Sequence, residues 1–390
     1  MSTLLIISPA PVLETLSGEV VLDSAFTEGM KLHCQLWPGR VYCLMRRGAQ
    51  DVPNGMRFSP RQLDFSLIVL DRGAPLPEAL LDEARVVYCA ADDMAYLDMP
   101  ARLKGRAGKL VYTIERPLSE RLRLAAREPG RSALSRLRGV QWALSHEPAL
   151  RRALRRADGL HCNGPLAGDA YGQLNPSTLV YMDNRIRLPV LAREADQDAR
   201  AERLRAGAPL TLATVAPLTA EYGAADLIDI AKRVQGLGVD FRLQIFGTGP
   251  FSADMEAAIA AHGLQDRVHL DAPPGFDTRM APYLRATADV FLAPWQVTEP
   301  VSGLIEAMGC GLPVLGYADP FWRRVQALSQ GGWTVRPVPA AMARRIAALD
   351  KGRQAIIDAS ARALDYARAN TFETVFARRM SHLRQVAGID

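Results

Sequence analysis

Residues 289–317, DVFLAPWQVTEPVSGLIEAMGCGLPVLGY, begin and end with apolar runs that predict two buried strands. Between the runs, Ser302 is typical of a residue that caps a helix N-terminus, and Gly309 and Gly311 are typical of a helix end. A strand, a helix and a strand in so short a stretch form the unit from which parallel sheets are built. The stretch therefore favours an α/β fold with helices on both faces of a parallel sheet.

The same alternation of strand-like and helix-like segments runs through both halves of the 390-residue chain. The first half contains β-rich runs such as 4–9 and 109–115, and the second half contains runs such as 210–215 and 241–247. A chain of this length is too long to fold around a single hydrophobic core. We therefore predict two Rossmann-like, doubly wound α/β domains that face a cleft, with ligands beyond the C-terminal ends of the strands.

A polar and charged segment at 188–208, with prolines near both ends, predicts an interdomain linker. The predicted domains are an N-terminal domain at 1–190 and a C-terminal domain at 191–370. The tail 371–390 predicts an amphipathic helix. We expect this helix to pack back on the first domain, and packing on the second domain is the alternative.

The composition favours an ordinary cytoplasmic globular protein. No stretch approaches the roughly 20 apolar residues that a membrane span needs. The N-terminus lacks the basic region of a signal peptide, and the five cysteines are odd in number and scattered, as in a reducing compartment. The six histidines form no metal-binding pattern, so we expect no metal site.

Positive charge is concentrated between Arg116 and Arg156, where eleven arginines accompany three acids. One interpretation is a solvated helical face. Another is attraction to an anionic surface, either the inner face of the cytoplasmic membrane or a phosphorylated acceptor. No nucleic-acid-binding module or interleaved aromatic residues accompany the patch, which disfavours nucleic acid as a partner.

Two carboxylates bracket the predicted helix start. If Ser302 is the N-cap, the next three backbone N–H groups lack partners within the helix and can bind an anion. Glu299 and Glu306 would repel a phosphate alone, but a carboxylate can accept two charge-assisted hydrogen bonds from a vicinal diol. The pattern therefore suits a sugar phosphate. The alternative is that Glu306 only stabilises the first helical turn and Glu299 is a solvated loop residue.

Residues 209–335 resemble the C-terminal domain of GT-B glycosyltransferases of the large retaining family 4 type, the glycosyl transferases group 1. The resemblance rests on the G-x-G turn at 247–249, the two glutamates, and EAMGCGLPV at 306–314. It extends more loosely to 150–164. It implies metal-independent transfer of a sugar from a nucleotide diphosphate sugar to an acceptor hydroxyl, with retention of configuration and without a cofactor.

The resemblance also implies roles for individual residues. Glu306 corresponds to the glutamate that binds the nucleotide ribose, and Glu299 nearly corresponds to the one that holds the hydroxyls of the transferred sugar. Glu115 falls where many relatives have a histidine close to that sugar, which makes Glu115 and Glu299 the candidate catalytic residues. The remaining positions implied for donor binding are Ser302, Gly303, Leu304, Gly247, Thr248 and Gly249, with 271–273 near the nucleobase.

The sequence departs from the family pattern at two places. The interval from Glu299 to Glu306 is seven residues where the family has eight, and Thr298 occupies the expected position. The loop at 216–223 reads APLTAEYG, so Pro217 and Tyr222 replace the arginine and lysine that neutralise the diphosphate in the family. Tyr222 is still expected at the donor site. Four arginines are candidates to replace the missing cations: Arg116, Arg121, Arg185 and Arg187.

The expected partners are a nucleotide-sugar donor and a glycan or glycolipid acceptor, which the first domain would bind during polysaccharide biosynthesis. An anionic membrane is a further expected partner through 116–156. Two alternatives remain open. One is a degenerate GT-B protein that binds a glycan or a partner without turnover, as the missing cations would allow. The other keeps the fold and changes the reaction, as in a nucleotide-sugar epimerase or a phosphorylase.

Overall fold

The computed structural model describes residues 2–48, 52, 55–127, 132–296 and 302–389. The chain divides into two compact units. The first comprises Met1–Met182 together with Glu373–Asp390, and the second comprises Asp183–Phe372. The sequence placed the corresponding boundaries at 190 and 370.

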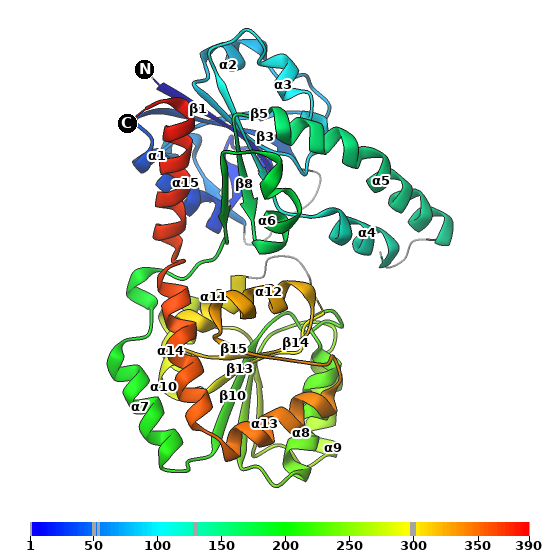
Figure 1. The fold of residues 1–390 in the computed structure, drawn as a ribbon, viewed down its shortest axis with the longest axis vertical. Coiled ribbons are helices and arrows are strands. Elements are labelled where there is room, and N and C mark those ends of the chain that lie inside the picture. Colours follow the sequence, from blue (N-terminus) through cyan, green and yellow to red (C-terminus); the bar gives the residue numbers. More distant parts are fainter. Residues whose placement is uncertain (1, 49–51, 53–54, 128–131, 297–301, 390) are drawn as a thin grey trace. The chain divides into compact units, whose positions relative to one another are not determined.

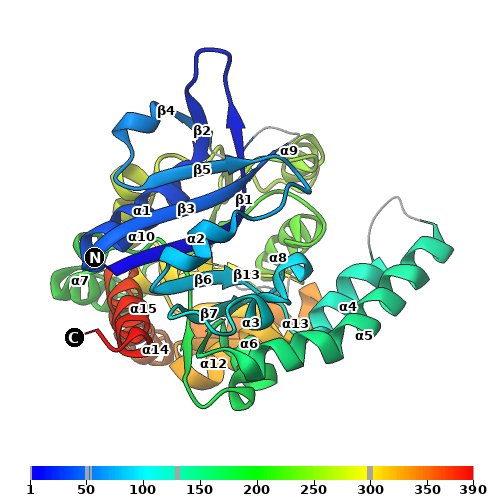
Figure 2. The same cartoon turned by 90° about the horizontal axis from the view of Figure 1, so that it is seen from above.

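The first unit is built on a parallel sheet that reverses its strand order beside β1. On one side of β1 lie β3 and then β5, and on the other side lie β6, β7, β8 and β9 in turn. The bounds of these strands are β1 Ser2–Glu14, β3 Gly39–Arg47, β5 Ser66–Leu70, β6 Val86–Ala90, β7 Lys109–Ile114, β8 Gly159–Asn163 and β9 Thr178–Tyr181. An antiparallel ribbon of β2 (Val20–Asp23) and β4 (Gly55–Phe58) continues from the end of β1 (Figure 2).

Helices cover both faces of this sheet, as the buried residues of β1 show. Leu4 and Ile6 pack into one core cluster with residues of the C-terminal helix α15 (Phe372–Ala387), whereas Leu5 and Ile7 pack into another with residues of α5 (Ala133–Arg156). A strand whose successive side chains are buried on opposite faces needs a helical layer on each. The other helices of the unit are α1 Ser24–Leu36, α2 Glu78–Glu83, α3 Met99–Arg102, α4 Leu118–Arg127 and α6 Pro165–Tyr171.

The second unit has a six-stranded parallel sheet in the order β12-β11-β10-β13-β14-β15. The bounds are β10 Leu210–Val215, β11 Phe241–Phe246, β12 Val268–Asp271, β13 Val290–Ala293, β14 Val314–Tyr317 and β15 Gly332–Val335. Its helices are α7 Glu194–Arg205, α8 Ala224–Gly236, α9 Ser252–Ala261, α10 Ala281–Thr287, α11 Ser302–Gly309, α12 Pro320–Ser329, α13 Pro339–Lys351 and α14 Gln354–Arg368 (Figure 1). The strand order reverses between β10 and β13, which is the switch point of a Rossmann-type sheet.

The predicted α/β class with two Rossmann-like sheets is confirmed, whereas a cleft between them stays a prediction. The predicted linker at 188–208 is wrong, because most of it forms helix α7, which belongs to the second unit. The helix carries many charges, but Ala201 and Leu204 are buried and Arg200 is only 1% exposed.

Helix α15 packs on the first unit through a cluster of buried polar side chains. His161 Nε2 lies 2.9 Å from His382 Nδ1, and His161 Nδ1 lies 3.1 Å from the Tyr88 hydroxyl. Arg379 Nη2 donates to the same hydroxyl at 2.9 Å. Burial, followed by the nearby Arg379 charge, lowers the pKa of His33 to about 3 and holds the pKa of His161 well below its usual value.

Acid is expected to destabilise the first unit because these histidines are neutral when folded. Their folded pKa values lie below the unfolded value of about 6.5, so their contribution is fully present above that pH. It is lost as the pH falls toward the folded pKa, at up to about 1.4 kcal/mol per pH unit for each histidine. Urea unfolding between pH 7.5 and 5 measures this loss. His33→Gln should make the loss smaller, and the exposed control His262→Gln should not; equal slopes in the two variants would contradict this explanation.

Candidate functional site

Three turns of the second unit lie at the same edge of its sheet. They follow the C-terminal ends of β10, β11 and β13, the strands on either side of the switch point. The turn after β10 is 216–223, the turn after β11 contains Gly247, Thr248 and Gly249, and the segment after β13 leads into α11. This edge is where open α/β sheets bind their ligands.

The first two turns hold each other through their backbones. The Leu218 N–H donates to the Thr248 carbonyl at 3.0 Å, and the Ala216 N–H donates to the Phe246 carbonyl at 3.1 Å. A Cβ atom on Gly247 would lie 2.2 Å from the Ala216 carbonyl oxygen, so no larger residue fits there. The glycines of the G-x-G turn are therefore required by the contact between the turns.

The third segment packs on the first turn through aromatic rings. Tyr222 and Trp295 meet edge to face with ring centroids 5.6 Å apart. Gly223 has φ = +71°, and a Cβ atom there would lie 2.2 Å from the Pro294 carbonyl oxygen. Trp295 also contacts the start of α11, because a Cβ atom on Gly303 would lie 3.4 Å from its Cη2 atom. The sequence reasoning treated Trp295 only as the end of a strand and missed this role.

Glu306 lies one turn into α11 and is partly buried. Burial raises the pKa of this carboxyl, and the Ser302 side chain and the nearby Arg185 oppose the rise. Within the described residues its Oε1 atom is buried without a hydrogen-bond partner. A buried acceptor oxygen in this state suits a ligand that brings hydroxyl donors.

Among the candidate cations, Arg185 lies close enough to Glu306 to affect its titration. Arg187 stacks on the Phe372 ring, with its guanidinium 5.5 Å from the ring centroid. Arg121 is almost fully buried, forms an ion pair with Glu147 and donates to the Tyr171 hydroxyl at 2.9 Å. That pairing neutralises Arg121 within the packing of the first unit, which argues against its predicted role as a cation for the diphosphate.

The candidate residues of the first unit lie at the end of β7. Glu115 is half-buried, and its Oε2 accepts a hydrogen bond from Asn163 Nδ2 at 3.1 Å. The backbone N–H groups of Glu115 and Arg116 donate to the carboxylate of Asp92 at 2.8 and 3.2 Å. Asp92 thus fixes the backbone that carries both candidates, and the sequence reasoning missed it. Its position in the sequence, just after the buried strand β6, could have identified Asp92 as a candidate. Glu299 and Thr298 lie outside the described residues.

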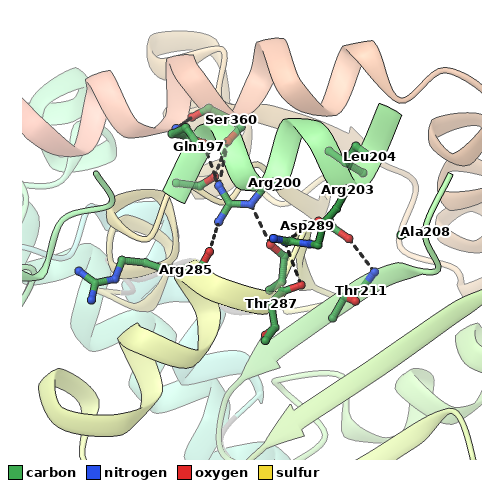
Figure 3. A network of polar contacts seen from close by, with 12 residues as sticks. Gln197, Arg200, Arg203, Leu204, Ala208, Thr211, Arg285, Thr287, Asp289 and Ser360 are labelled. Carbon is green, nitrogen blue, oxygen red and sulfur yellow. Dashed lines mark hydrogen bonds and ion pairs between the residues drawn. The ribbon is translucent and has the colours of Figure 1, made fainter. Parts of the chain in front are cut away.

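The far end of α11 is held by the buried Arg200, whose contacts with Gln197, Ser360 and Arg285 can be followed in Figure 3. Arg200 Nη1 donates to the Gly311 carbonyl at 2.7 Å, and Nη2 donates to the Cys310 carbonyl at 3.1 Å. The same guanidinium also donates to the Ala288 and Arg285 carbonyls, Gln197 Oε1 and Ser360 Oγ. Burial lowers the pKa of Arg200 to about 10, which still leaves it charged near neutral pH. A cation at a helix C-terminus stabilises that helix, so Arg200 fixes α11 from the end opposite the ligand edge.

Comparison with known proteins agrees with this arrangement. Residues 196–368 match the model of the family described as glycosyl transferases group 1. The second unit is a glycosyl transferases group 1 domain. It contains the edge formed by the turns at 216–223 and 247–249 and by helix α11. In the described part of the chain, no group of three or more His, Cys, Asp or Glu side chains is placed to hold a metal ion.

Two curated relatives of this glycosyl transferases group 1 domain illustrate the family. WcaL of Escherichia coli (strain K12), named as a colanic acid biosynthesis glycosyltransferase, is 32% identical over 153 residues, or 37% of this chain and 36% of WcaL. The 2-deoxystreptamine N-acetyl-D-glucosaminyltransferase of Streptomyces fradiae is 31% identical over 204 residues, or 50% of this chain and 46% of that protein. The matched regions thus span about a third to a half of these relatives.

A solved structure extends the likeness to both units. HepE of Anabaena in complex with UDP is 14% identical, with a TM-score of 0.64, and the alignment covers 99% of this chain and 100% of HepE. At this identity the likeness establishes the fold alone. With the family match, it identifies the fold as that of GT-B glycosyltransferases.

Proposed function

We propose that this protein is a glycosyltransferase that moves a sugar from a nucleotide diphosphate sugar to a hydroxyl of a glycan or glycolipid. The observation that carries the proposal is the buried Oε1 of Glu306, which has no hydrogen-bond partner among the described residues and lies near the start of α11, at the switch point of a glycosyl transferases group 1 domain. Glu306 would accept hydrogen bonds from the ribose hydroxyls. The backbone N–H groups at Gly303 and Leu304 would bind the diphosphate.

In this proposal the reaction needs neither a metal nor a cofactor. The helix start and Arg185 would supply positive charge to the departing diphosphate. In the family an arginine and a lysine do this, and Pro217 and Tyr222 stand at those positions here. Each preorganised donor of this kind typically lowers the activation free energy by about 3–4 kcal/mol. The leaving phosphate would take the proton of the attacking hydroxyl, and the configuration of the sugar would be retained. Glu115 and Glu299 would orient the transferred sugar, and Arg116 and Arg187 remain candidates for the phosphates.

The test is turnover of a panel of nucleotide sugars with saccharide and glycolipid acceptors, with and without a chelator. The expected result is a new glycosidic product that NMR shows to have the anomeric configuration of the donor, at a rate that the chelator leaves unchanged. Binding of a nucleotide sugar without any product would favour a degenerate binding protein. Conversion of the nucleotide sugar without an acceptor would favour an epimerase.

A membrane-borne acceptor is supported by the surface of α4 and α5, which lie side by side and extend away from the sheet of the first unit (Figures 1 and 2). Large apolar side chains are exposed on these helices at Leu124, Leu134, Leu137, Trp142 and Leu144. Exposed arginines on α5 are Arg138, Arg152, Arg155 and Arg156. Apolar side chains flanked by cations suit the interface of an anionic bilayer. No described helix is long and apolar enough to cross the bilayer. We propose that the surface of α4 and α5 binds the protein peripherally to the cytoplasmic face of the membrane.

Vesicle binding is expected to depend on this surface. Co-sedimentation with phosphatidylglycerol vesicles should exceed that with phosphatidylcholine vesicles and should fall with salt. The double variant Leu137→Gln/Leu144→Gln should bind several-fold less because each loses buried apolar area in the bilayer. Leu16→Gln removes a leucine that is even more exposed and lies outside these helices, and it serves as the control. Equal binding of both variants would refute the assignment of this surface.

A further inference from the structure

A cavity of about 470 Å³ lies in the first unit, at the carboxyl ends of its central strands. Residues at the ends of β1, β3 and β5 line it, together with the turn after β6. β1 lies between β3 and β6, where the strand order of the sheet reverses. The cavity thus occupies the position at which doubly wound sheets bind ligands, and its volume is that of a small-molecule site.

The lining is rich in cations. It contains Arg46, Arg47, Arg72 and Arg102, with Asp93 as the acid among the lining residues. Two of the four arginines are paired with acids that lie outside the lining. Arg47 forms ion pairs with Glu14 and Asp71, and Arg102 forms one with Glu78.

The other two lining arginines, Arg46 and Arg72, have no acidic partner among the described residues. Arg46 is half-buried and donates to the carbonyls of Asp71 at 2.9 Å and Ala74 at 2.6 Å. Its Nε donates to the Tyr96 hydroxyl at 3.1 Å. These acceptors fix the guanidinium in place, and no acid among the described residues is paired with it. Arg72 is exposed at the rim of the cavity, and within the described residues no hydrogen bond or ion pair engages its side chain.

The rest of the lining suits a saccharide rather than a bare ion. Tyr96 is one of the lining residues, and its hydroxyl accepts the hydrogen bond from Arg46 Nε. Pro9, Pro11 and Leu76 form an apolar part of the cavity wall. A few fixed polar groups on a mostly apolar wall are typical of small-molecule sites. A fixed guanidinium without an acid is typical of sites that bind phosphate or carboxylate.

From this geometry we infer that the cavity binds a saccharide bearing an oxyanion, a phosphate or a carboxylate, through Arg46 and Arg72. The inference rests on the proposed function, in which such a saccharide is part of the acceptor. It adds the chemical class of that acceptor. Arg46 would donate to the oxyanion from Nη2, because its Nε and Nη1 already donate to Tyr96, Asp71 and Ala74. Arg72 would add charge at the rim, and Tyr96 would contact the sugar.

Calorimetric titration tests the inference with three probes: glucose 1-phosphate, glucuronate and glucose. We expect either charged probe, or both, to bind more tightly than glucose, with an affinity that falls as salt rises. Whichever charged probe binds identifies the oxyanion as phosphate or carboxylate. Arg46→Gln should weaken that binding at least 10-fold and Arg72→Gln about 3-fold, whereas glucose binding should not change. Arg61→Gln removes an exposed arginine outside the lining and is the matched control.

Three results would overturn the inference: glucose binding as tightly as both charged probes, no binding of either charged probe, or unchanged binding in both cavity variants. Because Arg46 supports two backbone carbonyls, its variant is checked by thermal melting. Arg72→Gln removes no hydrogen bond or ion pair to the described residues, so it tests the inference even if Arg46→Gln fails to fold. A parallel titration with UDP separates this inference from the proposed function. Intact UDP binding without saccharide binding overturns only the cavity assignment, whereas failure of the wild type to bind UDP, GDP or any other nucleoside diphosphate overturns the function.

Discussion

Replacing Glu306 by glutamine is expected to reduce turnover of the nucleotide sugar by about 10²- to 10³-fold while the second unit stays folded. In the proposed site its carboxylate accepts two hydrogen bonds from the ribose diol. Hydrogen bonds to a charged group contribute about 1.5–3 kcal/mol each. Losing the charge and one acceptor oxygen therefore costs roughly 3–4 kcal/mol, and about 1.4 kcal/mol corresponds to a tenfold change.

Titration with a nucleotide diphosphate separates binding from folding in this variant. Affinity for the nucleotide should fall by a similar factor, and the melting temperature should not fall. The melting temperature should hold because burial of this carboxyl raises its pKa and disfavours its charge in the folded protein. Glu256→Gln changes an exposed glutamate on α9 and should alter neither property. Wild-type affinity and turnover in Glu306→Gln would show that Glu306 does not bind the donor, which would contradict the proposed site.

Replacing Arg200 by methionine is expected to destabilise the second unit by about 3–5 kcal/mol, because several buried carbonyls lose their donor and each unsatisfied group costs about 1–3 kcal/mol. Arg200 is 1% exposed, and all of the acceptors that it contacts are neutral. Methionine fills part of the volume but donates no hydrogen bonds. The buried carbonyls of Ala288 and Cys310 would then lose a donor that water cannot replace.

Urea unfolding followed by tryptophan fluorescence measures this cost. Arg203→Met is the matched control, because Arg203 lies on the same helix and its side chain is 33% exposed in a pair with Asp289. Asp289 in that pair is only 4% exposed but also accepts a hydrogen bond from the Thr211 N–H, so we expect the loss of Arg203 to cost less than the loss of Arg200. A cost for Arg200→Met no greater than that for Arg203→Met would show that the network in Figure 3 does not hold α7 against the end of α11.

Much of the fold could be predicted from local patterns. The apolar runs at 210–215 and 241–247 became β10 and β11, and the strand–helix–strand of 289–317 became β13, α11 and β14. Such patterns are visible because a buried strand or an amphipathic helix repeats over a few residues. Helix α7 was missed because its charge suggested solvent exposure. The burial of Arg200 depends on carbonyls more than 80 residues away along the chain.

The candidate site was predicted less completely, for a similar reason. Glu306 and the G-x-G turn were identified from short motifs, and the structure places them at one edge of the sheet. Trp295 and Asp92 were missed because their contacts join separate strands. Arg121 was a candidate cation by its position after a strand, and only the packing of α4 against α5 reveals its partner Glu147.

Amide hydrogen exchange with and without UDP tests the central claim most directly, because it locates the nucleotide on the chain. We expect slower exchange at 216–223, at 247–249 and at the start of α11 when UDP is added, and no slowing in Glu306→Gln at the same UDP concentration. Protection confined to the first unit, or no protection at the start of α11, would contradict the claim that this edge of the second unit binds the donor.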